Sequence, residues 1–398
     1  MNLIVDGTNL AHRARHAYSL SYQGQDTSVT YGVMRMLGAL VKYYNPASVI
    51  FAWDGGTPGF RRRLVPSYKS KRKHDDDPTW DMFLYQVREL EHILPYAGVL
   101  QVRRAGIEAD DLMAQAAQML IGKNLIVSTD TDMLQCVNDN TSVLRPGKKD
   151  VTYDAKNFEK LVGFPVYKYV LSKVLQGDSS DNVPGVLGIG PKTVVKLLQN
   201  DNVLEAATPK MRSRIEAFIS DGHYNSAYSV MDLSADHTGA RLALLDAPWR
   251  KAHAKRLTKW CMDHGFVSII EAFSLSIFGS LQEPEFDQLL RRTPLVWDYR
   301  RYPVENRMTA EEYVHKLELV LAPHFAPGGI YNGKDGAMRL AREVGYGLRE
   351  LEDADKVIQT LYSRLLVKFT FATNVPVDAK PWFDEIRRAM NDGSLLGC

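Results

Sequence analysis

The sequence predicts an α/β protein whose parallel sheet is flanked by helices. Short apolar runs alternate with helical stretches through the first 180 residues, and this alternation is typical of a parallel sheet. We expect strands at residues 2–5, 47–52 and 124–128, because each run is rich in β-branched or aromatic residues and is bounded by turn residues. Helices are expected between them at residues 29–43 and 109–120.

The strand signals fade after about residue 155, which suggests a change of architecture. Residues 1–155 should form the α/β core, and residues 156–280 should form a region of short helices and loops. The stretch 282–294 combines proline and charge without periodicity, so we expect a boundary there. Residues 281–398 would then form a C-terminal extension of unknown fold and function, with helices expected at 336–344 and 353–366.

Composition excludes several classes of protein. Of the 398 residues, 45% are hydrophobic and 24% are charged, which fits a folded globular chain and not a disordered one. No apolar run approaches the roughly 20 residues of a membrane span, and the N-terminus lacks the pattern of a secretory signal. Three cysteines cannot build a disulfide framework. We therefore expect reduced thiols in a cytoplasmic protein that does not contact a membrane.

Acidic residues follow all three of the expected strands. Asp6 and Asp54 end the first two runs, and Asp130 with Asp132 follows the third. One such aspartate is commonly a turn residue or a helix cap. Because sites in open α/β sheets form beyond the carboxyl ends of the strands, acids at three strand ends predict a shared site.

Two further acidic clusters can join this site. Glu108, Asp110 and Asp111 lie at the start of a helical stretch, where their negative charges could simply interact favourably with the helix dipole. If Glu108 and Asp110 share a site, Glu108 must lie just before the helix begins. Asp178 and Asp181 lie in a stretch that could also be an ordinary turn. Nine acids in one cleft would repel each other, and oxygen ligands of this kind favour Mg²⁺ or Mn²⁺ over zinc.

Basic character is concentrated around the expected acidic site. Residues 1–280 carry 33 Lys and Arg against 29 Asp and Glu, whereas residues 281–398 carry 16 against 18. Residues 60–73 read FRRRLVPSYKSKRK, in which aromatic residues alternate with charge. This segment could be a solvated loop, but its composition also suits phosphate neutralisation with base stacking. A basic exterior around a metal-filled acidic pocket suits a polyanionic substrate.

A glycine hairpin precedes a short helix at residues 183–198. Gly188 and Gly190 allow the backbone to approach a phosphate, and Lys192 and Thr193 begin the helix that follows. The pattern Gly-Ile-Gly-Pro-Lys-Thr followed by Val-Val-x-Leu-Leu predicts a helix–hairpin–helix element.

Together these motifs resemble those of the structure-specific 5′ nucleases, which are the bacteriophage flap endonucleases and the 5′-nuclease domain of bacterial DNA polymerase I. The resemblance is dense from residue 1 to about 200 and weaker to about 275. The matching motifs are Asp6-Gly7 with Arg13, Asp54 followed by Phe60-Arg61 and Tyr68-Lys69-x-x-Arg72, Glu108-Ala109-Asp110-Asp111, Asp130-x-Asp132, and Gly177-Asp178-x-x-Asp181-Asn182 with the hairpin. The segment after Lys71 is short and ends in three aspartates, which departs from the family, and nothing transfers to residues 281–398.

The resemblance implies a PIN-like nuclease core with a helical arch at about 60–95. It implies two or more Mg²⁺ ions, with Mn²⁺ able to substitute, and a K⁺ ion at the helix–hairpin–helix. The implied ligands of the first metal are Asp6, Asp54, Glu108 and Asp110 with Asp111 close by, and those of the second are Asp130, Asp132 and Asp181 with Asp178 nearby. The arch would supply Lys69 and Arg72 to the scissile phosphate. The implied DNA contacts are Arg13, Arg61, Tyr68, Gly188, Gly190, Lys192 and Thr193.

The activity implied is that of a 5′→3′ exonuclease and flap endonuclease that hydrolyses DNA and RNA primers by a two-metal-ion mechanism during replication or repair. The expected partners are branched or flapped DNA and RNA primer–DNA hybrids, with replication proteins as further partners of a monomer. One alternative is a PIN-type ribonuclease acting on single-stranded RNA, which needs neither the hairpin nor the arch. The other is a non-catalytic protein that binds DNA junctions, which does not need nine matched acids.

Overall fold

The computed structural model describes residues 1–70, 77–200 and 202–286. The chain divides into two compact units after Asp287, and the described residues all lie in the first unit. The helices expected at 336–344 and 353–366 therefore lie outside the described residues, as do Arg72 and the acidic residues 75 and 76. The prediction of a separate core at 1–155 and helical region at 156–280 stays a prediction.

The described residues form eight strands, fourteen α-helices and four 3₁₀ helices. The strands are β1 (Asn2–Asp6), β2 (Ser21–Tyr22), β3 (Gln25–Asp26), β4 (Ser48–Ala52), β5 (Leu100–Val102), β6 (Asn124–Val127), β7 (Thr141–Arg145) and β8 (Val151–Tyr153). The helices of the first half are α1 (Gly7–Ala17), α2 (Ser28–Tyr44), α3 (Gly59–Leu64), α4 (Trp80–Ile93), η1 (Leu94–Ala97), α5 (Ala109–Met119) and η2 (Asp132–Cys136). The remaining helices are α6 (Phe158–Val162), η3 (Val166–Lys168), α7 (Tyr169–Gln176), α8 (Pro191–Leu198), α9 (Val203–Ala206), α10 (Pro209–Ser220), α11 (His223–Met231), α12 (Ala240–Asp246), α13 (Ala254–Asp263), α14 (Val267–Phe273) and η4 (Leu275–Ser280).

The main sheet has six strands in the order β5-β4-β1-β6-β7-β8. The α/β class is confirmed, and the three strands expected from the sequence are the adjacent strands β4, β1 and β6. All pairs are parallel except β7 with β8, which is antiparallel. The sheet is therefore mixed and not fully parallel, because β8 follows β7 through a short turn, which only antiparallel strands allow.

A row of polar side chains fixes the register where the three central strands begin. Asn2 is in register with Ser48 on one side and with Asn124 on the other. The Ser48 hydroxyl donates to Asn2 Oδ1 at 2.8 Å, and Asn2 Nδ2 donates to Asn124 Oδ1 at 2.9 Å. All three side chains are buried, so each bond satisfies a polar group that would otherwise be costly to bury.

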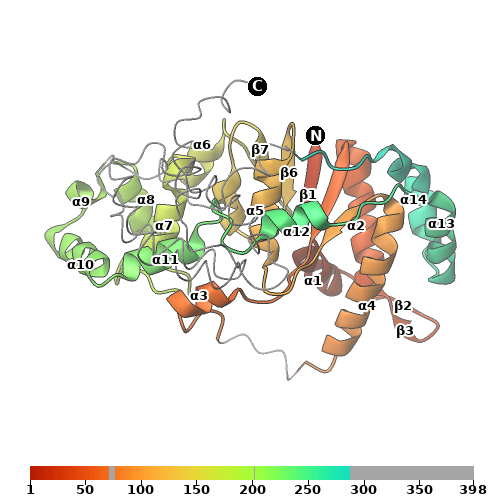
Figure 1. The fold of residues 1–398 in the computed structure, drawn as a ribbon, viewed down its shortest axis with the longest axis horizontal. Coiled ribbons are helices and arrows are strands. Elements are labelled where there is room, and N and C mark those ends of the chain that lie inside the picture. Colours follow the sequence, from red (N-terminus) through yellow and green to blue (C-terminus); the bar gives the residue numbers. More distant parts are fainter. Residues whose placement is uncertain (71–76, 201, 287–398) are drawn as a thin grey trace, which may run out of the picture. The chain divides into compact units, whose positions relative to one another are not determined.

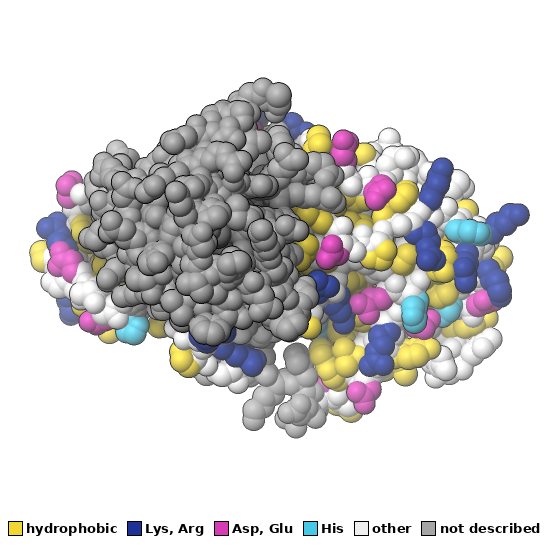
Figure 2. Space-filling model, viewed as in Figure 1, with side chains coloured by type: hydrophobic (Ala, Val, Ile, Leu, Met, Phe, Trp, Pro, Cys, Tyr) yellow, Lys and Arg dark blue, Asp and Glu magenta, His cyan; other side chains and the backbone are white. Residues whose placement is uncertain are grey.

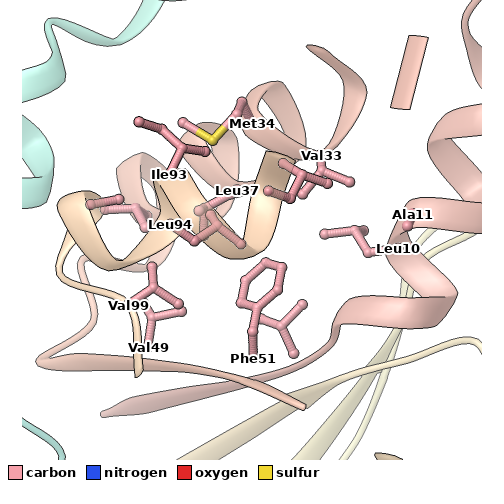
Figure 3. Close-up of a cluster of buried hydrophobic side chains, with 14 of the residues drawn as sticks. Leu10, Ala11, Val33, Met34, Leu37, Val49, Phe51, Ile93, Leu94 and Val99 are labelled. Carbon is pink, nitrogen blue, oxygen red and sulfur yellow. The ribbon is translucent and has the colours of Figure 1, made fainter. Parts of the chain in front are cut away.

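Apolar side chains that alternate along the strands pack under helices α1, α2 and α4. Val49 and Phe51 of β4 lie against Leu10 of α1, Leu37 of α2 and Ile93 of α4 (Figure 3). Ile4 and Ile50 occupy the intervening strand positions and are fully buried on the opposite face. Helix α5 covers that face and packs in turn against α12 (Figure 1).

The helical half contains the predicted hairpin between α7 and α8. Helices α8, α9 and α10 lie at one end of the described unit, and α13 and α14 lie at the other end (Figure 1). Residues 281–286 return to the edge where the strands begin, since Gln282 donates to the carbonyl of Ala47 and Ile121 donates to that of Glu285. Within the described ranges, no helix combines the length and the apolarity that crossing a membrane requires.

Candidate active site

The carboxyl ends of β4, β1 and β6 bring three aspartates to one edge of the sheet. Asp6 is the last residue of β1, Asp54 lies two residues beyond β4, and Asp130 lies three residues beyond β6. Asp6 accepts hydrogen bonds from the amide of Asn9 and the hydroxyl of Ser128, both at 2.8 Å. Asp54 accepts from the amide of Ala109 at 3.0 Å and so caps helix α5. The acids therefore stabilise local structure and also face one shared site.

The electrostatics of these aspartates show that they share one negative site. Burial and the neighbouring Asp54 and Asp130 raise the pKa of Asp6 to about 7. Burial and the charges of Asp130, Asp6 and Asp54 raise the pKa of Asp110 well above its usual value. A bound divalent cation would relieve this repulsion, and an all-carboxylate donor set suits Mg²⁺ or Mn²⁺. The residues present therefore fit the implied metal.

The second acidic cluster is organised around Lys173 of α7. The ammonium of Lys173 lies 2.7 Å from Asp132 and 2.9 Å from Asp178. Burial and Asp130 raise the pKa of Asp132 to about 6 even though Lys173 opposes the shift. Although burial opposes it, hydrogen bonds from Lys173 and Ser180 lower the pKa of Asp178 to about 2. Asp178 also accepts hydrogen bonds from the amides of Ser180 and Asp181. These bonds form a turn, which the sequence analysis gave as the alternative to a metal-binding role for this stretch.

Glu108 lies at the N-cap of α5, immediately before the helix, as sharing a site with Asp110 requires. Residues 59–70, where the sequence predicts the start of an arch, supply three donors to this carboxylate. Lys69 Nζ lies 2.6 Å from Oε1, Tyr68 Oη donates to Oε2 at 3.0 Å, and Arg61 Nη1 also donates to Oε2. Burial alone would lower the pKa of Lys69, but Glu108 and Asp181 raise it above its usual value.

Two of the implied DNA contacts, Arg61 and Tyr68, are buried and pair with carboxylates in this structure. Arg61 and Tyr68 are 1% and 5% exposed, so neither side chain offers a surface to a phosphate or a base. Arg61 forms a bidentate pair with Asp111, with both N–O distances at 2.8 Å. Because both oxygens of Asp111 accept from Arg61, this carboxylate is held as the partner in a bidentate ion pair.

One pocket connects the two acidic clusters and is closed at the back by apolar side chains. Its lining residues are Arg61, Tyr68, Glu108, Asp110, Asp132, Asp178, Asp181, Val183, Val230, Met231 and Leu233. Among the described residues, no group of three or more His, Cys, Asp or Glu side chains has the arrangement of a ready-formed metal site. In this structure Lys69, Lys173 and Arg61 hold several of the acids as ion pairs.

The hairpin ends at the start of helix α8. Gly188 has φ +87°, which glycine adopts without strain, and Gly190 caps helix α8. Lys192 is exposed in the first turn of α8, and Thr193 is half-buried. Arg214 of α10 donates to the carbonyl of Leu187 at 2.9 Å and so supports the hairpin from its side.

The cations at the edge of the site lie in different surroundings. Arg13 lies half-buried on α1, and within the described chain its Nη1 is buried without a hydrogen-bond partner. Arg145, at the end of β7, donates twice to the carbonyl of Thr129 beside Asp130. Sequence reasoning missed Arg145 and Lys173, because each meets its partner only through the fold. Arg72 lies outside the described residues.

Over the face in Figure 2, charged side chains of both signs are interspersed with hydrophobic ones.

Comparisons with known proteins agree with this fold. A family model described as the 5′-3′ exonuclease N-terminal resolvase-like domain matches residues 1–163. The 5′-3′ exonuclease of Aquifex aeolicus is 31% identical over 207 residues, which cover 51% of this chain and 70% of that protein. DNA polymerase I of Treponema pallidum is 36% identical over 204 residues, but the chain spans only 20% of its length. A structure of phage T5 5′-exonuclease with bound zinc ions shares the fold, with a TM-score of 0.50 at 21% identity over 66% of this chain and 99% of that one.

The fold is therefore that of the resolvase-like nuclease domain. The extent of the match to the Aquifex protein identifies the group more closely: the chain belongs to the 5′-3′ exonuclease family.

Proposed function

We propose that the chain is a divalent-cation-dependent 5′→3′ exonuclease and flap endonuclease that acts on DNA and on RNA primers annealed to DNA. The observation that carries this proposal is the placement of Asp54, Asp6 and Asp130 at the ends of three adjacent parallel strands. Membership of the 5′-3′ exonuclease family supports it. Replication or repair in the cytoplasm is the setting that we infer for such an enzyme.

The residues that would hold the cations are the strand-end acids with Asp110 and Glu108, joined by Asp132, Asp178 and Asp181. Bound Mg²⁺ ions would stabilise the charge that develops on the phosphate during hydrolysis. Mn²⁺ would substitute because it accepts the same oxygen ligands.

The chain's own cations would orient the DNA. Lys69 carries an ammonium group between Glu108 and Asp181, where a phosphate entering the site would meet it. The Gly188–Gly190 hairpin with Lys192 would hold the duplex at one phosphate. Arg13 would supply a further positive charge beside the strand ends. A K⁺ ion at the hairpin, a monomeric state, a role for Arg72 and contacts with replication proteins stay predictions.

The proposal is tested by cleavage of a 5′-flapped DNA duplex, with single-stranded RNA of the same length as the competing substrate. We expect Mg²⁺-dependent release of the flap, no activity in EDTA and little cleavage of the RNA. The control variant is Asp6→Asn, because asparagine keeps the helix-capping hydrogen bond of Asp6 and removes its charge. Preferential cleavage of the RNA would favour the ribonuclease, and tight junction binding without cleavage would favour the binding protein.

A further inference from the structure

We propose that Arg61 and Asp111 form a buried pair that positions the carboxylate of Glu108, and that neither residue contacts DNA or a metal ion. The proposal rests on the function proposed above, because it assigns the supporting side chains of that same site. The sequence alone does not suggest this role, because Arg61 belongs to a run of three arginines and Asp111 belongs to a run of acids.

Every nitrogen of the Arg61 guanidinium already has a partner. Nε donates to the carbonyl of Val230 at 3.0 Å, and Nη2 donates to Asp111. Nη1 donates to both Asp111 and Glu108. With only 1% of the residue exposed, the guanidinium offers no surface to a phosphate. The planar fork of an arginine matches a carboxylate at two points, so the pair with Asp111 fixes the plane of the guanidinium.

This fixed guanidinium connects three elements at the back of the pocket. Arg61 lies on α3, Asp111 lies in the first turn of α5, and Val230 lies near the end of α11. Glu108 meets the guanidinium because its backbone is extended at the N-cap and its side chain does not cap the helix. Asp54 caps α5 in its place, so the carboxylate of Glu108 can turn toward the arch.

The charges in this cluster are closely paired. Two cations, Arg61 and Lys69, face Glu108 and Asp111, and Lys69 also lies 3.6 Å from Asp181. If Arg61 were removed, Glu108 and Asp111 would both lose a buried partner, and the carboxylate of Glu108 would no longer be held in its present position. Lysine at this position keeps the charge but cannot donate to Asp111, Glu108 and the carbonyl of Val230 in one plane.

The alternative is that Arg61 binds a DNA phosphate, as its neighbours on the segment could. The two roles differ in what they change. A phosphate-binding arginine contributes to affinity and to its salt dependence, and removing it should lower the salt slope by about 1. A positioning residue leaves binding intact, and its removal lowers the cleavage rate and the affinity for the metal, by about 10–100-fold for a ligand-supporting residue.

The test compares Arg61→Lys and Asp111→Asn with Arg62→Lys, because Arg62 is the exposed next residue of the same helix. Mn²⁺ affinity is measured in the full-length protein without DNA by electron paramagnetic resonance. Flap-DNA affinity is measured in EDTA at several salt concentrations, and single-turnover cleavage is measured against Mg²⁺ concentration. Thermal denaturation monitors folding, and Asp111→Asn serves as the milder variant if Arg61→Lys is unstable.

We expect Arg61→Lys and Asp111→Asn each to weaken Mn²⁺ binding and slow cleavage by about 10-fold or more. DNA affinity and its salt slope should stay within about twofold of the wild type, and Arg62→Lys should not affect the metal. Because the two residues act through one interaction, the double variant should lose little more than either single variant. The Mn²⁺ measurement keeps the proposal testable even if the wild type cleaves no flap, which would refute only the proposed function.

Three outcomes would overturn the proposal. Weaker DNA affinity with a salt slope lower by about 1 in Arg61→Lys would make Arg61 a phosphate-binding residue. Loss of Mn²⁺ binding in Asp111→Asn alone would make Asp111 a metal ligand. Unchanged Mn²⁺ affinity and cleavage in both variants would show that the pair only stabilises the fold.

Discussion

The backbone amide of Lys69 donates a hydrogen bond of 2.9 Å to the carbonyl of Asp181. Lys69 adopts φ +53°, a left-handed conformation that costs a non-glycine residue about 1–2 kcal/mol. Ser67 adds a second bond nearby by donating to the carbonyl of Asn182 at 3.0 Å. Residues 67–69 are thus held against the turn that carries Asp178 and Asp181, and strain at Lys69 is consistent with a functional site.

Lys69→Ala should lower the cleavage rate far more than DNA affinity. A donor placed in a partly dehydrated site contributes about 10²–10³ to the rate, whereas one cation among several contributes little to bulk attraction. Single-turnover rates and dissociation constants on one flap substrate check this. Arg63→Ala is the control, because Arg63 is exposed on the same segment. Equal losses of rate in both variants would show that the segment only attracts DNA by its overall positive charge and that Lys69 has no specific role.

Asp130→Ala should abolish cleavage while junction binding persists. Asp130 lies beside Asp6 and Asp110, whose pKa values it helps to raise, so its charge belongs to the cation site. In the proposed function, the hairpin and the basic surface supply the affinity for duplex, and this variant leaves both unchanged. Retention of more than about a tenth of the wild-type single-turnover rate would contradict this, since removing a ligand should cost several kcal/mol of transition-state stabilisation.

Lys192→Glu should weaken duplex binding and lower its salt slope by about 1. Lys192 is exposed beside the hairpin in the first turn of α8. Lys196→Glu, one turn further along the same helix, makes an identical charge change away from the hairpin and should have a smaller effect. If the two variants lose affinity equally, the hairpin does not hold a phosphate.

Gly55→Ala should destabilise the protein and disturb the site. A Cβ atom at Gly55 would lie 1.7 Å from the carbonyl oxygen of Arg104, so the loop after Asp54 or the loop before Glu108 must move. Overpacking of this kind typically costs about 1–3 kcal/mol, which thermal denaturation would report as a lower Tm. Gly59→Ala is the control because its nearest neighbour is a flexible arginine end at 3.4 Å. Equal Tm values would show that the loops accommodate the methyl group.

Cys261 should resist thiol reagents at neutral and mildly alkaline pH. Burial in α13 raises the pKa of its thiol to about 12, so at about pH 8 only about one molecule in 10⁴ carries the reactive thiolate. The measurement uses a Cys136→Ser, Cys398→Ser variant, in which Cys261 is the single thiol, with and without denaturant. Rapid reaction of the folded protein would show that this part of α13 opens to solvent.

The acids at the strand ends could be predicted from sequence because parallel strands deliver their carboxyl ends to one edge. Recognising three strands was therefore enough to predict that Asp6, Asp54 and Asp130 lie together. The local sequence pattern was enough to predict the hairpin that contains Gly188 and Gly190. The position of Glu108 before α5 could also be predicted. Side chains two residues apart on a helix point in different directions, so Glu108 and Asp110 can share a site only if Glu108 lies before the helix.

The roles of Arg61 and Lys173 could not be predicted in this way. Three consecutive arginines at 61–63 look alike, and α3 has six residues, which is too few for a period to show that Arg61 points inward. Lys173 and Asp132 are far apart in the sequence, so only the packing of α7 on η2 brings them together. Long-range ion pairs depend on the complete fold and leave no local pattern.

The polar row of Ser48, Asn2 and Asn124 has a consequence for the opposite ends of the same strands. A slip of one residue would send every side chain of a strand to the other face, and the row prevents this by hydrogen bonds far from the acids. The alignment of the strands that carry Asp6, Asp54 and Asp130 therefore does not depend on the charges of these acids. Replacing one of them should leave the others where they are, so neutralised variants are suitable for capturing the enzyme with an uncleaved substrate.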